Sequence, residues 1–509
     1  MKEKIAGIFR PTNIRTCFMR NLHFSSRSNR HARLLACGCL FALSACASGS
    51  QSIRTDEALA DTASFSSGKD IGAAAVQPGR TVAVSWWTAW RDPQLDRLIA
   101  SEASTAPSIA VAAARMRRAA AGLDAAIADR LPTVDGSAQA VGERFPDHST
   151  YDAPYAGNWG SDGALTANAS YALDFWGKRR DTQAAAAARL DMARAEADDA
   201  TLLLRTALVD AYVRLDAAYH ERDMATAGLA RRQGVIDLLS IRERAGLATG
   251  IETTQTREAT TATRDEIARL DGEIAARRHQ IAALLGRDPA FADGLTRPSL
   301  KAIVDPAPLS AIPANLLGAR ADVAAARAAV EAAARDIGVA RAAFYPDVDL
   351  IAFSGVKSVG LGSLLRAGSI ATGAGAAVSL PIFDGGRLRA NLRGKAADYD
   401  AAVAAYNGAL TEALRQVADG VSNLTTERAR QGEARAAIAH WSRILDLQKL
   451  RERQGLSSAA DRLSTETALL LAQRHAAKAD ARVAVAQIAL IRALGGAWTP
   501  SSTLSGQVQ

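Results

Sequence analysis

The chain has 509 residues, of which 48% are hydrophobic and 22% charged, and its formal net charge is +8. Eight basic residues and one acid fall within the first 45 positions, so the remainder carries only about +1 and a nucleic-acid-binding role loses its main support. All four cysteines lie at or before position 46, which excludes disulfides and thiol chemistry from the rest of the chain.

The first 45 residues have the pattern of an export signal. An apolar run at 34–45 follows the basic region, and at about 1.5 Å per residue it is too short for a bilayer core of about 30 Å. The run ends in Leu43-Ser44-Ala45-Cys46, which is similar to a bacterial lipobox, where the cysteine is acylated. We therefore predict a signal peptide at 1–45, lipidation of Cys46 and a flexible tether at 46–85. The alternative is an ordinary secretory signal with a chance cysteine.

The first predicted helix follows a tryptophan-rich segment, Trp86–Trp90. Asp92 before Pro93 matches an N-cap followed by a proline in the first turn. A small-residue pattern then predicts one helix to about Arg130, just before Pro132. The three tryptophans fit either a ligand cage or a buried anchor for this helix, and we favour the anchor.

Four segments alternate between apolar and polar residues with the period of a β-strand: 133–142, 165–175, 347–355 and 374–383. A long loop at 146–163 is expected between the first two. Each segment is about ten residues long, the length of a tilted membrane-spanning strand. Four strands are too few for a single-chain barrel, which needs about eight, and an open edge cannot face lipid. Several chains must therefore close one barrel; the alternative is two soluble hairpins packed on helices.

The helical part of the chain occurs twice. The glycines that open, interrupt and close each copy recur 209 positions apart, as Gly177 and Gly386, Gly246 and Gly455, Gly286 and Gly495. The segment 178–244 contains no proline and would be about 100 Å long as one helix. Shorter return helices are expected at 253–285 and 460–494. The alanine-rich faces of the helices, as at 184–188 in the first long helix, favour a closed wall of helices, because small side chains allow close helix packing on two sides.

The resemblance to a known family rests on motifs spread along nearly the whole chain after the signal. They are residues 170–178 (Ser-Tyr-Ala-Leu-Asp-Phe-Trp-Gly-Lys), 337–346, 381–387 (Pro-Ile-Phe-Asp-Gly-Gly-Arg) and 493–496. The chain resembles the TolC-like outer membrane efflux proteins, in the NodT-type lipoprotein branch that serves RND pumps. It departs from the family pattern at Ala321, where proline is usual, and at Arg327, where glutamate is usual.

The resemblance implies a fold that is mainly α with membrane β. Each chain would give four strands to a trimeric transmembrane β-barrel and two hairpins to a long α-helical coiled-coil barrel in the periplasm. The implied domains are a first repeat at 86–286, a linker at 287–311, a second repeat at 312–496 and a tail at 497–509. The implied partners are two further copies of the chain, a periplasmic adaptor, an inner membrane RND pump and outer membrane lipid.

The implied function is the passive exit duct of a tripartite efflux system, located in the outer membrane. Nothing indicates an enzyme, a cofactor or a metal site, because the histidines after the signal are scattered without metal-ligand spacing; they are His148, His220, His279, His440 and His475. Two alternatives remain: a duct for type I protein secretion, which shares the fold, and a surface-anchored coiled-coil structural lipoprotein.

Two turns are candidate docking tips. Each long helix is followed by a glycine and a leucine, Gly246 with Leu247 and Gly455 with Leu456. A glycine there suits a left-handed helix cap and needs no further role. A leucine repeated beside it at the far end of both hairpins predicts a docking ring for the adaptor.

Two aspartates are candidate gate residues. Asp237 and Asp446 stand nine positions before the tip glycines and are again 209 apart. A ring of carboxylates at a constriction would favour cations. The alternative is that Asp446 pairs with Lys449 or Arg451 on its own helix.

Overall fold

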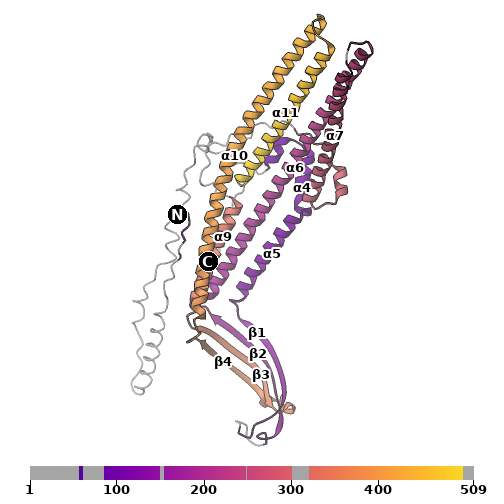
Figure 1. The fold of residues 1–509 in the computed structure, drawn as a ribbon. Helices are drawn as coiled ribbons and strands as arrows, with labels where there is room; N and C mark the ends of the chain where they lie inside the picture. The colour runs from indigo at the N-terminus through magenta and orange to yellow at the C-terminus, as the bar shows by residue number, and fades with distance from the viewer. Residues whose placement is uncertain are drawn as a thin grey trace. The chain divides into compact units, whose positions relative to one another are not determined.

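A computed structural model describes residues 55, 57–60, 85–148, 154–247, 249–300 and 320–496. The expected signal peptide, Cys46 and the C-terminal tail lie outside these residues. In each half of the described chain a shorter helical region is followed by two strands, a long helix and a return helix. This order repeats the arrangement that the 209-residue duplication predicts (Figure 1).

The region expected to form one helix from Pro93 to Arg130 forms two, so this prediction is wrong. α4 (Pro93–Thr105) ends at Ala106, and α5 (Pro107–Ala128) begins directly after it. Pro107 causes the break, because a proline disfavours helical geometry in the residue before it. Ala106 is accordingly extended, with φ −71° and ψ 122°.

The start of α4 is anchored by the buried carboxylate of Asp92. It accepts hydrogen bonds from the backbone of Gln94 (2.8 Å) and Ser299 (2.7 Å) and from the hydroxyl of Tyr212 (2.9 Å). Burial opposes ionisation of this group, but the hydrogen bonds outweigh it and lower the pKa of Asp92 below its usual value. The predicted N-cap is confirmed.

The tryptophans precede α4 in η3 (Trp86–Trp90), a short 3-10 helix. Trp86 and Trp90 are buried in a hydrophobic core that also contains Tyr212 and Ile488. The prediction of a buried anchor is confirmed. The segment expected to be a linker contributes to the same core: η4 (Pro289–Gly294) leads to Leu295, which is buried, and Leu300 packs beside it.

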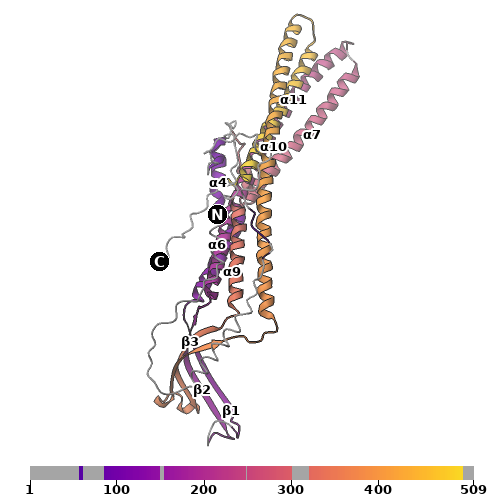
Figure 2. The same ribbon diagram turned by 90° about the vertical axis from the view of Figure 1, so that its left-hand side faces the viewer.

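The strands form one antiparallel sheet in the order β1 (Thr133–Arg144), β2 (Trp159–Leu173), β3 (Asp347–Val359) and β4 (Ile370–Ser379). The central β2–β3 pairing joins the two repeats into this sheet (Figure 2). Two short 3-10 turns, η5 (Leu361–Ser363) and η6 (Ala367–Ser369), connect β3 to β4. Among the described residues, the outer edges of β1 and β4 pair with no further strand.

The starts of β1 and β3 match the prediction, and the other six strand ends differ from it by two to six residues. β2 begins at Trp159 rather than near 165, because it pairs with β1 as far as Arg144, and the connecting loop is correspondingly shorter. β4 ends at Ser379 rather than at 383. Pro381 explains the earlier end, because proline has no N–H to donate to the ladder.

One face of the sheet is apolar across all four strands. The register places Val134 opposite Ala169, and Leu165 opposite Val356. On the other face polar residues of β1 and β2 meet, as in the hydrogen bond between Ser137 and Thr166 (2.9 Å), whereas β3 places Ile351 and Phe353 there. The large side chains of the apolar face are exposed: Val134, Leu165, Tyr171, Leu350, Ile370 and Val378. The sheet thus presents an uncovered apolar surface within the described chain.

The helical hairpins agree closely with the prediction. The first consists of α6 (Lys178–Arg244) and α7 (Gly250–Leu284), and the second of α10 (Arg387–Arg453) and α11 (Ala459–Ala493). α6 and α10 each have 67 residues, about 100 Å of helix. α9 (Ala321–Ala342) packs against both long helices.

The two hairpins contact each other mainly through α6 and α11 (Figures 1 and 2). Their buried residues include many alanines, such as Ala185, Ala211 and Ala476, which permit close approach of the helices. No helix in the described ranges has the length and hydropathy needed to cross a membrane.

Candidate functional site: the free ends of the hairpins

Both long helices end in the same backbone motif. Gly246 and Gly455 have φ of 69° and 74°, in the left-handed region. The next amide in each copy, of Leu247 or Leu456, donates to a carbonyl five residues back at 2.8 Å, which completes a Schellman motif. A Cβ at either glycine would meet nothing within 4 Å, so the backbone conformation, and not crowding, requires glycine here.

The leucines beside these glycines are among the more exposed apolar residues of the described chain. Leu247 is 69% exposed and Leu456 is 64% exposed. Arg242 and Arg451 extend toward the same turns, and each guanidinium lies within 3.5 Å of the carbonyl oxygen of the adjacent tip leucine. Each tip therefore combines an exposed leucine with a nearby cation.

The two predicted gate aspartates are exposed on α6 and α10. Asp237 accepts a hydrogen bond from Gln233 at 3.1 Å. Within the described part of the chain, Asp446 forms no ion pair with Lys449 or Arg451, and Arg451 instead reaches the tip leucine. The local pairing that competed with a gate role is therefore not observed.

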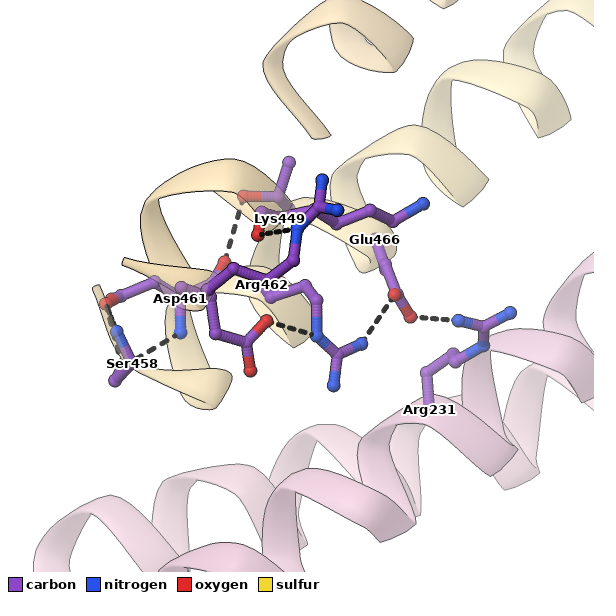
Figure 3. Close-up of polar contacts among 9 residues, drawn as sticks. Arg231, Lys449, Ser458, Asp461, Arg462 and Glu466 are labelled. Carbon is purple, nitrogen blue, oxygen red and sulfur yellow. Dashed lines mark hydrogen bonds and ion pairs between the residues drawn. The ribbon is translucent and has the colours of Figure 1, made fainter. Parts of the chain in front are cut away.

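A chain of ion pairs joins the two hairpins near these ends (Figure 3). Arg462 on α11 donates to Glu452 on α10 at 2.8 Å and to Glu466 on α11 at 2.6 Å. Glu466 is also paired with Arg231 on α6. The two carboxylates raise the pKa of Arg462, with the hydrogen bond to Glu466 as the largest cause. The network fastens α6 to α11 close to the turns.

The first residues of α11 hold this network in place. Ser458 and Asp461 form a reciprocal capping box, in which the serine hydroxyl accepts from the amide of Asp461 and the aspartate accepts from the amide of Ser458. These hydrogen bonds lower the pKa of Asp461. The cap fixes the first turn of α11 and thereby the position of Arg462 (Figure 3).

A second ionic cluster joins the hairpins farther from the tips. Arg474 on α11 contacts both Glu221 on α6 (3.7 Å) and Glu266 on α7, and Lys478 pairs with Glu221 at 2.9 Å. The pKa of Glu266 falls to about 2 because of its hydrogen bond to Arg269 and the charge of Arg474. Ion pairs therefore join α6 and α11 at two positions along their length, one near the tips and one farther from them.

Sequence reasoning missed these ion pairs. The signal that would have revealed them is an antiparallel charge match, since Glu221 and Arg231 of α6 lie opposite Arg474 and Glu466 of α11. Among the described residues, no group of histidine, cysteine, aspartate and glutamate is placed to hold a metal ion.

Comparison with known proteins identifies relatives of this architecture. The family model described as "Outer membrane efflux protein" matches residues 98–287 and 312–496. The fusaric acid resistance protein FusA of Burkholderia cepacia is 39% identical over 318 residues, which span 61% of this chain and 59% of FusA. The multidrug resistance outer membrane protein MdtP of Escherichia coli is 30% identical over 81% of this chain and 86% of MdtP.

Solved structures show the same fold. The outer membrane protein VceC from Vibrio cholerae is similar with a TM-score of 0.74 and 33% sequence identity, over 82% of this chain and 99% of VceC.

Proposed function

Because the chain belongs to the outer membrane efflux protein family, we propose that three copies of it form the exit duct of a tripartite efflux system. The chain is an outer-membrane efflux channel and not an enzyme. In the proposal, each copy gives its four strands to one membrane barrel and its two hairpins to the wall of a periplasmic tunnel.

The observation that carries this proposal is the four-stranded sheet with an uncovered apolar face and two unpaired edges. An open edge cannot face lipid, because each unpaired backbone group there would cost several kcal/mol. Pairing β1 of one copy with β4 of the next satisfies both edges. Three copies would give twelve strands, within the range of known barrels.

The partners that we propose are a periplasmic adaptor and an RND-type inner membrane pump. The exposed Leu247 and Leu456 support the adaptor, because apolar side chains at the end of a hairpin favour a docking contact. FusA and MdtP are named for resistance to small molecules, which favours efflux over the alternative of type I protein secretion.

Asp237 and Asp446 are the proposed gate. Their exposure and the lack of an ion pair to Lys449 or Arg451 in the described chain leave both carboxylates available to line a passage. Six carboxylates in a trimer would repel one another and attract cations at this level.

The proposed membrane attachment includes a lipid at Cys46, after removal of residues 1–45. Mass spectrometry of the mature chain should show an acylated N-terminal cysteine, and an N-terminus elsewhere would contradict the anchor. Cys46→Ala should weaken anchoring and leave the trimer intact, since the apolar face of the barrel also holds it in the membrane.

The function is tested by deleting the chain in cells that retain the pump and adaptor. We expect intracellular accumulation of small pump substrates, restored to the normal level by the wild-type chain. Normal accumulation with loss of a secreted protein from the medium would favour the secretion duct. No change in either would favour a structural lipoprotein.

A further inference from the structure

The two hairpins are equivalent residue by residue, and not only in their outline. Arg222 of α6 pairs with Asp271 of α7. The residues 209 positions later, Gln431 of α10 and Asp480 of α11, form a hydrogen bond of 2.6 Å. The tip contacts repeat with the same spacing. Adding 209 to a residue number in the first hairpin therefore gives its structural counterpart in the second.

This equivalence predicts a second hairpin contact that one chain cannot make. Within the chain, the first hairpin meets the second through α6, α7 and α11. In a closed ring the second hairpin must meet the first hairpin of the next copy in a similar way. α10 and α11 then take the places of α6 and α7, and α7 of the neighbour takes the place of α11.

The ionic cluster at Arg474 can be transferred to this contact position by position. The counterpart of Arg474 is Asp265, and the counterparts of Glu221 and Glu266 are Arg430 and His475. One base between two acids thus becomes one acid between two bases. At these three positions an acid replaces the base, and a base and a histidine replace the two acids, so the three side chains remain complementary.

These three residues are accessible for such a contact. Asp265 and His475 are exposed and form no ion pair within the described chain. Arg430 pairs with Glu427 on its own helix, but its side chain remains 55% exposed. Arg269, the counterpart of Lys478, is already paired with Glu266 and Glu273, so it brings little uncompensated charge close to Arg430.

Apolar residues on the same helix point to the same contact. Ile444 and Leu447 of α10 are exposed. Their counterparts on α6, Val235 and Leu238, are half-buried. The apolar side chains at these positions are thus more exposed on α10 than on α6. Burying them against a second copy would be favourable, because apolar surface would be removed from water.

We propose that Asp265 of one copy binds Arg430 and His475 of the next, and that this cluster sets the register between subunits. The proposal rests on the trimeric assembly proposed above. It does not extend to the tips, where the counterparts of Arg231 and Glu466 are His440 and Arg257. These two do not attract each other, so only one of the two ionic levels recurs between subunits.

Chemical cross-linking tests the contact. The trimer carrying Asp265→Cys and Arg430→Cys, treated with a short thiol-reactive cross-linker, should give covalently joined chains on a denaturing gel. The matched control carries Arg474→Cys and Glu221→Cys, the equivalent pair within one chain, and should react without joining chains. A second control, Glu252→Cys with Arg430→Cys, moves one thiol about 20 Å along α7 and should not react.

Charge reversal tests the complementarity. Asp265→Arg should speed dissociation of the trimer roughly tenfold by placing like charges together. Adding Arg430→Glu and His475→Glu copies the arrangement at Arg474 and should restore the wild-type rate. A trimer by native mass that shows neither interchain cross-linking nor rescue would overturn this contact and leave the proposed function standing. A monomer would overturn both.

Discussion

Glu466 of α11 and Arg231 of α6 form an ion pair across the two hairpins, a few turns from the free ends. The carboxylate is nearly buried and also accepts from Arg462, which in turn holds Glu452 of α10. Glu466 and Arg462, both on α11, therefore connect α6 to α10. A movement that separates the two hairpin ends must therefore break the ion pair between Arg231 and Glu466.

Removing this ion pair should loosen the hairpin ends. Arg231→Ala and Glu466→Ala should each increase the conductance of single channels in planar bilayers. The pair is partly exposed, so we expect a coupling energy on the order of 1 kcal/mol. The double variant should then behave much like the stronger single variant. Additive effects would show that the two residues act separately, and Glu433→Ala, an exposed acid on α10, serves as a control.

The tip leucines should be required for efflux but not for assembly. Leu247→Ser with Leu456→Ser removes the exposed apolar side chains and keeps the glycines that cap the helices. We expect drug susceptibility equal to that of a deletion strain and an unchanged trimer by native mass. Leu471→Ser, an exposed leucine about four turns along α11, is the control. Wild-type susceptibility of the double tip variant would reject docking by these leucines.

The gate aspartates should determine ion selectivity. Asp446→Ala, alone and together with Asp237→Ala, should reduce the preference for cations and the block by divalent cations in single-channel recordings. Each substitution removes a carboxylate that is exposed in the single chain. Unchanged selectivity in the double variant would make the two residues ordinary surface charges.

The anchor at Asp92 should make stability depend on pH. Its pKa is lowered in the folded chain, so its stabilising contribution is complete above the unfolded value of about 3.9 and is lost as the pH falls through the folded value. Asp92→Asn keeps a helix-capping side chain but should cost roughly 1 to 3 kcal/mol at pH 7. The difference from the wild type, measured by thermal unfolding, should shrink below about pH 4. Asp124→Asn, at an exposed site on α5, should have little effect at any pH.

The positions of glycine and proline were sufficient to predict the helical hairpins from the sequence. The glycines at 177 and 246, with no proline between them, predicted both ends of α6 correctly. The same rules explain where prediction failed, because Pro107 and Pro381 lie inside segments that were extended on periodicity alone. At Pro107 the restricted backbone of the preceding residue ended the helix in spite of the small-residue pattern. At Pro381 the missing N–H ended the strand in spite of the alternating pattern.

The contacts between hairpins could not be predicted in the same way. Arg231 and Glu466 are 235 positions apart, and their pairing depends on how α6 and α11 are aligned. Neither helix has a one-sided apolar pattern that fixes this alignment, because alanine and charged residues occur on all faces. The 209-residue repeat was enough to predict the hairpin tips and the two aspartates from the sequence. The ion pairs between the hairpins became visible only in the structure.

Closure of one barrel by three chains is tested most directly by the native mass of the mature protein in detergent, combined with planar bilayer recording of the same sample. We expect three chains per particle and a stable conducting pore, since one chain offers a four-stranded sheet with two unpaired edges. A stable monomer without conductance would contradict the argument that several chains must close one barrel.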